Sequence, residues 1–314
     1  MSVRGADAPL VHVAGNAVVD VLLRADECPP APPEDRWADN TEILSAPVGF
    51  ALGGCGAASA YALGFLGARV SLNTNIGADD AGQMLRGWLA EAGVHVAATA
   101  GHSAVHIIRL SVQGRQSSYH TGERVDWFVS RSLVPAPAWA LLSGFGAVTA
   151  DDLEEMAEVC DFLKRQGTRI AFDPSPWFRG RTTVSQMQRA FAGCDLLLGT
   201  EEEIGEWIPG DSLEALTQGA LDCGPQGVVV KRGPQGAFYA DPEATGEAPA
   251  VSIQGGNSVG AGDTFNARIV YGRATGEPLG ESTAAAVALS TELVRRGMGV
   301  RGAFAESEQP EETR

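Results

Sequence analysis

The stretch Gly255–Phe265 has residue types and spacing that could hold an anion and move a proton, because it combines four glycines with a single carboxylate, Asp263. Before it, residues 251–253 alternate like a short strand. After it, apolar residues recur at near-helical spacing from Phe265 onward. The pattern predicts a strand, a glycine-rich turn and a helix that begins near Gly262.

The predicted helix start could bind a phosphate group. The first N–H groups of a helix are unpaired and carry partial positive charge, and glycines let an anion approach that backbone closely. Gly260, Ala261 and Gly262 therefore form a candidate anion hole, beside which Asp263 could accept a proton from an attacking hydroxyl. The alternative is that Asp263 only caps the helix, since Asp is a favoured cap residue.

This stretch resembles the second signature of the ribokinase-like carbohydrate kinases of the phosphofructokinase B type, Asp-Thr-x-Gly-Ala-Gly-Asp-x-Phe. Residues 260–263 and Phe265 match it as they stand. In that family the last Asp is the catalytic base and the glycine turn holds the transferred phosphoryl group. The resemblance implies these roles for Asp263 and for the turn before it.

Two positions depart from the signature, since Asn257 and Ser258 stand where the family has Asp and Thr. In several members that Asp belongs to a monovalent-cation site. The use of a monovalent cation by this chain is therefore left open.

A second candidate carboxylate, Asp20, interrupts the apolar run 17–23, which follows a predicted strand over residues 10–15. It could be an exposed residue on the polar face of a strand. The resemblance implies a function instead, because ribokinase-like enzymes carry an Asp five residues after the glycine here numbered Gly15, where it binds substrate hydroxyls.

Gly53 and Gly54 open a predicted helix of small residues that runs to Gly67. This segment resembles the family's first signature, Gly-Gly-x-Gly-Ala-Asn, which implies that both glycines lie at the acceptor. Ala58 replaces an Asn that hydrogen-bonds the sugar in relatives. One acceptor contact is therefore missing or is supplied from elsewhere in the chain.

Residues 104–122 predict a hairpin with a tight glycine turn, and with the extended segment 42–52 they would form a small sheet. In the family that sheet is a lid that closes over the sugar and often forms a homodimer contact. The aromatic residues expected in it would cover a substrate or pack between subunits: Phe50, Tyr119, Trp127 and Phe128. His102 and His106 have the spacing of a helical metal pair, but their apolar neighbours favour a strand.

From Leu141 onward, predicted helices and strands alternate: helix 151–166, strand 169–172, helix 184–191, strand 195–198, helix 213–223 and strand 227–231. Such alternation predicts an α/β fold, a doubly wound and mostly parallel sheet with helices on both faces. A site is expected at the carboxyl ends of the strands. Small residues in the last predicted helix, 282–296, would allow close packing or seat an adenine.

Two of those strand ends resemble nucleotide-binding motifs of the family. Thr200 and Glu203 resemble Asn-x-x-Glu, which organises Mg²⁺ and phosphate, although glutamates in a first helical turn are also ordinary dipole partners. Lys231, Gly233 and Gly236 match Thr-x-Gly-x-x-Gly except at Lys231, a base that could help to hold ATP phosphates. The resemblance implies ATP and Mg²⁺ as cofactors.

Composition limits the other partners. The 39 acidic and 23 basic residues among 314 give a net charge of −16, which disfavours nucleic acid and anionic membranes. No apolar run reaches the length of a membrane span, Met1–Pro9 lacks a signal segment, and five cysteines show no disulfide or zinc spacing, which favours a cytoplasmic protein. Residues 306–314 are expected to form a disordered acidic tail on a single domain spanning 1–314.

The sequence therefore predicts an ATP-dependent kinase that phosphorylates a hydroxyl of a sugar or sugar-like acceptor. One alternative is a nucleoside kinase on the same fold. The other is a sugar- or nucleotide-binding protein that has lost catalysis, suggested by the departures at Ala58, Thr200, Asn257 and Ser258. The identity of the acceptor is left open.

Overall fold

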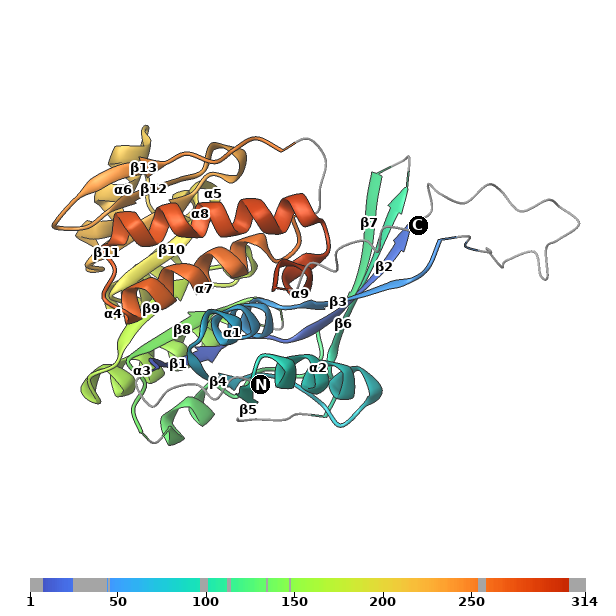
Figure 1. Cartoon of the computed structure of the whole chain (residues 1–314). Helices are drawn as coiled ribbons and strands as arrows, with labels where there is room; N and C mark the ends of the chain where they lie inside the picture. Colours follow the sequence, from blue (N-terminus) through green and yellow to red (C-terminus); the bar gives the residue numbers. More distant parts are fainter. Residues whose placement is uncertain are drawn as a thin grey trace, which may run out of the picture.

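The computed structural model describes residues 8–24, 44, 46–96, 101–111, 114–133, 135–146, 148–253 and 258–304. At its centre lies a nine-stranded sheet in the order β13-β12-β11-β10-β9-β8-β1-β4-β5 (Figure 1). The strands from β5 to β11 pair in parallel, and β12 and β13 add an antiparallel edge. The bounds are β1 (Leu10–Ala14), β4 (Arg69–Asn73), β5 (Val94–Val96), β8 (Trp139–Ser143), β9 (Arg169–Asp173), β10 (Leu196–Thr200), β11 (Gly227–Lys231), β12 (Ala237–Ala240) and β13 (Thr245–Ala248).

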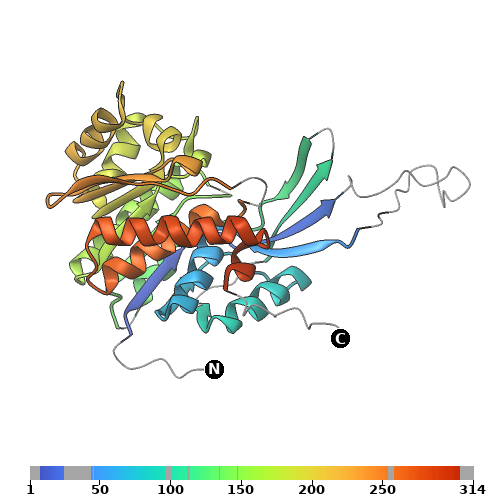
Figure 2. The ribbon, with the colours of Figure 1, turned by 45° about the horizontal axis from the view of Figure 1, so that its top comes forward.

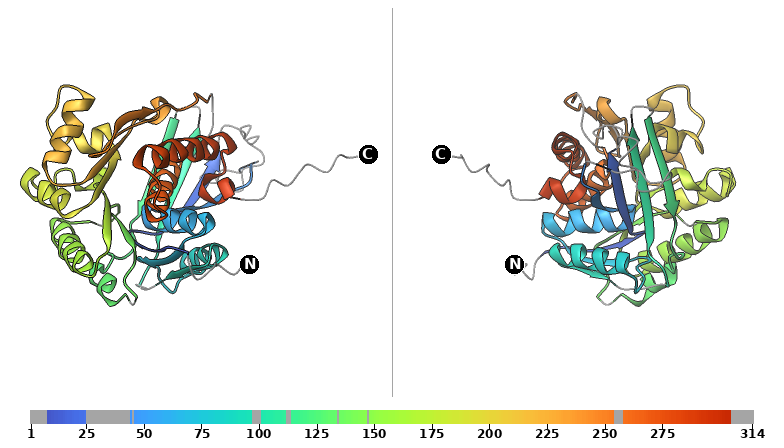
Figure 3. Two further views of the ribbon diagram at one scale, coloured as in Figure 1. Left: turned by 60° about the vertical axis from the view of Figure 1, so that its left-hand side comes forward. Right: turned by 90° about the vertical axis from the view of Figure 1, so that its right-hand side faces the viewer.

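Helices cover both faces of this sheet, which explains why its central strands are apolar on both sides (Figure 3). One face carries α1 (Cys55–Leu66), α2 (Asp80–Glu91), α7 (Ala261–Ala274) and α8 (Leu279–Arg296), with α9 (Gly299–Phe304) packed against α8. The other carries α3 (Ala150–Arg165), α4 (Val184–Gly193), α5 (Glu201–Gly205) and α6 (Leu213–Asp222). The predicted doubly wound α/β fold is confirmed.

A separate four-stranded sheet projects from one end of this domain (Figure 2). It contains β2 (Val18–Arg24), β3 (Gly49–Gly53), β6 (Ala104–Ser111) and β7 (Gly114–His120) in the order β3-β2-β6-β7. The hairpin predicted over residues 104–122 is thus confirmed, and we call this element the lid sheet. Only residues 15–17 separate β1 of the central sheet from β2 of the lid sheet.

Two expectations about individual segments were wrong. Residues 251–253 form no strand, and within the part of the chain that the structure describes β13 is the last strand before the glycine turn. Trp127 and Phe128 lie outside the lid sheet, in the 3-10 helix η2 (Trp127–Ser132). The Trp127 ring is buried in the apolar core under the central sheet, and its Nε1 donates to Asp152 Oδ1 of α3 at 2.6 Å, which joins this segment to the main domain.

Several other expectations can be compared with the described residues. Within them, no helix is long and apolar enough to cross a membrane. Four of the five cysteines are described and are free thiols, at positions 55, 160, 194 and 223. The glycines at 255 and 256, Asn257 and the acidic tail 306–314 lie outside the described residues.

Candidate active site

The ends of three neighbouring parallel strands bring polar side chains together. Asp173, Thr200 and Lys231 are the last residues of β9, β10 and β11, and Thr200 is paired with Lys231 in the sheet register. Lys231 Nζ lies 2.9 Å from Asp173 Oδ2, and both side chains are largely buried. The carboxyl edge of the sheet therefore places an ion pair where a ligand site was expected.

Asp173 is also held by its neighbours. The Ser175 N–H donates to Asp173 Oδ1 at 3.1 Å, and Asn266 Nδ2 of α7 donates to Asp173 Oδ2 at 2.5 Å. Asn266 was missed in the sequence analysis, although it lies three residues after Asp263 and hence on the same side of a helix. This hydrogen bond joins the strand ends to the start of α7.

The start of α7 has the geometry that the glycine turn predicted. Gly260 is the N-cap residue in the left-handed conformation, with φ of 82°, which a residue without Cβ adopts readily. Asp263 lies in the first turn, and its side chain makes no capping hydrogen bond within the described residues. The interpretation of Asp263 as a cap is therefore wrong. Ser290 Oγ of α8 donates to the Ala261 carbonyl at 3.0 Å and secures this turn from the other side.

The charges around Asp263 change its acidity. Burial raises the pKa of Asp263 to about 7, repulsion from Asp173 adds to the increase, and the ammonium group of Lys231 opposes it. Burial lowers the pKa of Lys231, but attraction to Asp173, Glu203 and Asp263 outweighs burial and raises that pKa to about 12. At neutral pH the lysine is charged and the aspartate can take up or release a proton.

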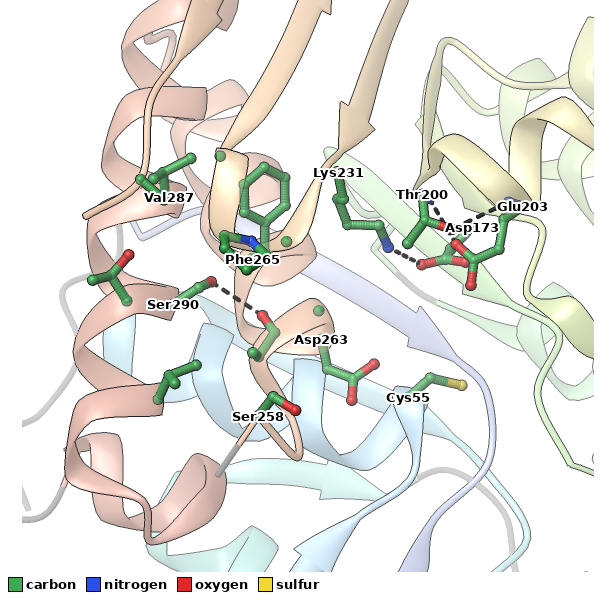
Figure 4. Close-up of a pocket in the computed structure, with 18 of the residues that line it drawn as sticks. Cys55, Asp173, Thr200, Glu203, Lys231, Ser258, Asp263, Phe265, Val287 and Ser290 are labelled. Carbon is green, nitrogen blue, oxygen red and sulfur yellow. Dashed lines mark hydrogen bonds and ion pairs between the residues drawn. The ribbon is translucent and has the colours of Figure 1, made fainter. Parts of the chain in front are cut away.

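These side chains line one cavity of about 470 Å³, a size typical of small-molecule sites (Figure 4). The predicted residues that line it are Thr200, Glu203, Lys231, Gly233, Gly236, Ala261, Gly262 and Asp263. One end is mainly apolar and lies between residues 250–253 and α8, with Val287 and Val294 on the wall. The other end is lined by Cys55, Ser143 and Phe145, which the sequence analysis had not selected.

Thr200 and Glu203 also have a structural role. The Thr200 Oγ1 accepts from the Glu203 N–H, and Glu203 Oε2 accepts from the Thr200 N–H at 2.7 Å, which makes a capping box at the start of α5. No group of three His, Cys, Asp or Glu side chains within the described residues is close enough to hold a metal. Carboxylate oxygens in this cavity nevertheless suit Mg²⁺, which is commonly bound through one or two carboxylates together with substrate phosphates.

Four other predicted residues do not line this cavity: Gly260, which is the N-cap of α7, and Asp20, Gly53 and Gly54, which lie beyond the Cys55 end at the base of the lid sheet. Asp20 is 4% exposed and His106 Nδ1 lies 3.1 Å from its Oδ1, so the interpretation of Asp20 as an exposed strand residue is wrong. A Cβ atom on Gly53 would overlap the Asp20 carboxylate, which explains the glycine. The electrostatic effect of Asp20 on Asp263 connects the two parts of the site.

Asn16 occupies the N-terminus of α1 and was also missed. Its carbonyl accepts from the N–H groups of Gly56 and Ala57, and its Oδ1 accepts from the N–H of Cys55 at 3.0 Å. The first N–H groups of the helix that Gly54 caps therefore already have hydrogen-bond acceptors within the protein. The position of Asn16 between Gly15 and Asp20 in the sequence was the signal that could have identified it.

Comparison with known proteins identifies the family. The model of the pfkB family carbohydrate kinases matches residues 9–301. The chain belongs to this family. Its departures at Ala58, Thr200, Asn257 and Ser258 are thus variations within this family.

Solved structures share the pfkB fold of this chain. It is similar to Arabidopsis thaliana ribokinase complexed with ribose and ATP, at 18% identity and a TM-score of 0.72 over 94% of this chain and 95% of that one. Thermotoga maritima ribokinase matches at 21% identity and 0.71, over 95% and 96%. An E. coli protein assigned as ribokinase II, in complex with ATP and Mg²⁺, matches at 19% and 0.72, over 94% and 96%.

Proposed function

We propose that this pfkB kinase transfers the γ-phosphoryl group of ATP to a hydroxyl of a sugar or sugar-like acceptor, with Asp263 as the base. The observation that carries the proposal is the position of Asp263. It lies in the first turn of α7, has a pKa of about 7, and shares a cavity with Lys231. A base with a pKa near neutrality suits proton abstraction at physiological pH.

The residues that line the cavity suit the parts of an ATP molecule. The apolar end beside α8 suits an adenine, and the turn formed by Gly233 and Gly236 lies between that end and Lys231. The ammonium of Lys231 would lie beside the phosphates at the start of α7. Bound ATP in the A. thaliana and E. coli structures supports this assignment.

Mg²⁺ would neutralise charge on the phosphates, and the carboxylates of Glu203 and Asp173, which line the cavity, would supply oxygen donors for it. The capping box leaves Glu203 fixed in place on α5. The use of a monovalent cation, which the sequence leaves open, depends on Asn257, and this residue lies outside the described residues.

The reaction follows from these positions. The acceptor oxygen attacks the γ-phosphorus, the new P–O bond forms, and the bond from that phosphorus to the β,γ-bridging oxygen breaks so that ADP leaves. The hydroxyl proton passes to the Asp263 carboxylate. The N–H groups of Gly260 and Gly262 and the Lys231 ammonium stabilise the charge on the transferred group, whereas the Ala261 N–H of the predicted anion hole donates to the Ser258 carbonyl at 3.1 Å.

The acceptor is expected on the Asp20 side of Asp263. We infer that Asp20 accepts hydrogen bonds from acceptor hydroxyls beside Gly53 and Gly54, and that the lid sheet covers the acceptor. We further infer that residues 1–314 act as one kinase domain whose lid strands occupy roughly 42–52 and 104–122, and that two copies pair through the lid sheet.

The function is tested by ADP release. Purified protein with ATP and Mg²⁺ should release ADP only when a panel of sugars, sugar phosphates and nucleosides contains the acceptor, and mass spectrometry should find the acceptor heavier by one phosphoryl group. A nucleoside as the sole acceptor would establish the nucleoside kinase. Absence of turnover with every member, together with measurable ATP binding, would favour the binding protein.

A further inference from the structure

Three side chains form a row across the lid sheet. Asp20 of β2 is paired with His106 of β6, and His106 is paired with Tyr119 of β7. Residues paired across neighbouring strands point to the same face. His106 Nδ1 accordingly lies 3.1 Å from Asp20 Oδ1, and the His106 and Tyr119 rings meet edge to face with centroids 5.4 Å apart.

The row continues from the lid sheet into the main domain through aromatic rings. Tyr119 contacts Trp177, which follows β9, with centroids 5.6 Å apart, and Trp177 contacts Phe145, which follows β8, at 5.2 Å. The Tyr119 hydroxyl also accepts from Asn16 Nδ2 at 3.0 Å. Phe145 lines the cavity that contains Asp263, so these rings form one wall that reaches from the lid sheet to that cavity.

The geometry of this wall distinguishes between flat and polyhydroxylated ligands. A nucleobase stacks on the open face of an aromatic ring, whereas these rings are tilted by 55° and 58°, contact one another and so cover part of each other's faces. A row of contacting rings offers one apolar surface, with the Asp20 and His106 pair at its end. An apolar surface with a few convergent polar groups suits a sugar or polyol, whose C–H groups can face the rings while its hydroxyls reach the pair.

The charges favour an acceptor without a phosphate or carboxylate. Asp20 and Asp173 both raise the pKa of Asp263, after burial, so three carboxylates already repel one another around the reacting position. The nearby ammonium of Lys231 is paired with Asp173. Arg181 is exposed and donates to the Trp177 carbonyl. A further negative charge in the acceptor would be repelled over these short distances.

We propose that the Asp20–His106 pair and the wall formed by Tyr119, Trp177 and Phe145 bind an uncharged, polyhydroxylated acceptor, and that His106 is a specificity-determining residue for it. The assignment of these residues to the acceptor rests on the proposed kinase function. His106 lies in the lid sheet and supplies a polar contact to the acceptor from there. The sequence analysis considered this residue only as a metal ligand or as part of a strand.

The first experiment measures binding in the absence of ATP, so it is independent of turnover. Matched probes are D-ribose with D-ribose 5-phosphate, D-fructose with D-fructose 6-phosphate, and D-glucose with D-gluconate, together with adenosine. Calorimetry should show at least one neutral sugar binding about 10-fold or more tightly than its charged partner. A charged partner or adenosine as the tightest ligand would overturn the proposal, as would the absence of binding by every neutral sugar at millimolar concentration.

The second experiment assigns His106 with the neutral sugar so identified. His106→Ala should weaken sugar binding about 10-fold, because the hydrogen bond between His106 and an acceptor hydroxyl is lost, and leave the KM for ATP unchanged. His106→Asn, which keeps a donor near the position of Nδ1, should restore most of the affinity. The matched control is His120→Ala, since His120 is exposed and adjacent to Tyr119 on β7 but on the opposite face.

Outcomes for the two hypotheses can be separated. If neutral sugars bind and His106→Ala weakens their binding while no acceptor is phosphorylated, the proposed sugar site is supported and the proposed kinase function is wrong. If a neutral sugar is phosphorylated but His106→Ala and His120→Ala bind it equally well, with melting temperatures equal to that of the parent, the role of His106 is wrong. Trp177→Leu should weaken binding of the same sugar more than Trp177→Phe does. Equal affinity of these two variants and the parent would show that the wall does not bind the sugar.

Discussion

Asp173 Oδ2 lies 2.9 Å from Lys231 Nζ, and the same carboxylate repels Asp263 across the cavity. The three side chains come from β9, β11 and α7, so their charges are coupled although they are far apart in the sequence. Lys231 therefore acts on both carboxylates. Its positive charge neutralises Asp173, and it lowers the pKa of Asp263, which helps that group to lose its proton.

The pH dependence of the kinase should report Asp263. Because the base must be deprotonated, kcat/KM should fall as the pH drops below about 7, the pKa to which burial and Asp173 raise this carboxyl group. Lys231→Met removes the cation that opposes this increase, so the midpoint should move to higher pH. Rate profiles for the parent, Lys231→Met and Lys231→Arg measure the effect, and an unmoved midpoint in Lys231→Met would show that this lysine does not control the base.

Asp263→Asn should separate activity from stability. Turnover should fall by roughly 10²-fold or more, the scale of a positioned proton acceptor. Since the folded state raises the pKa of this carboxyl group, its ionised form destabilises the protein at pH values above that pKa. The variant should therefore melt at a higher temperature than the parent at about pH 8. Near-normal turnover in a folded variant would remove Asp263 from the mechanism.

Asp20→Ala should affect the acceptor and leave ATP binding unchanged. Charged hydrogen bonds are worth about 1.5–3 kcal/mol, so acceptor affinity should fall by roughly 10- to 150-fold. Separate titrations of acceptor and ATP, with the melting temperature recorded alongside, test this. Loss of stability without a change in acceptor affinity would assign Asp20 a purely structural role.

His12 should make the stability of the fold sensitive to acid. It is fully buried in β1 between Ser71 and Ser130, and burial lowers its pKa from 6.5 to about 4. The unfolded chain therefore binds a proton that the folded chain excludes, and stability present above about pH 6.5 is lost as the pH falls towards 4, by up to about 3 kcal/mol. Urea unfolding at about pH 7 and about pH 5 should show a smaller loss for His12→Gln than for the parent.

The homodimer expected through the lid sheet has a direct test. Phe50 and Ile107 point away from the Asp20 face and are 53% and 42% exposed. Phe50→Asp should shift the mass measured by light scattering towards that of one chain, because it places a charge in the proposed contact. Val184→Asp, an equally exposed position on α4, is the control. A parent protein of single-chain mass would contradict the expectation.

The sequence could predict those parts of this site whose positions depend on neighbouring residues along the chain. Asp263 follows a glycine turn at a helix start, and Lys231 ends a strand, so both positions follow from the pattern of neighbouring residues. His106 and Trp177 were not selected, because their proximity to Asp20 and Tyr119 arises from strand register and from packing between the lid sheet and the main domain.

The errors have similar physical causes. Residues 251–253 alternate in polarity because Val251 and Ile253 line the cavity from an irregular segment, and alternation alone cannot distinguish this from a strand. Trp127 was placed in the lid by its position after the hairpin. Its actual position depends on a hydrogen bond to Asp152, 25 residues later in the chain.

The contact between Gly53 and Asp20 restricts how this acceptor site can change in evolution. A Cβ atom at position 53 would occupy the space of the Asp20 carboxylate, so a larger residue there requires that side chain to shift or to be lost. Relatives that have exchanged Asp20 for a smaller residue are therefore free to diversify at position 53, whereas those that keep the acid should keep glycine. The two positions are accordingly expected to covary.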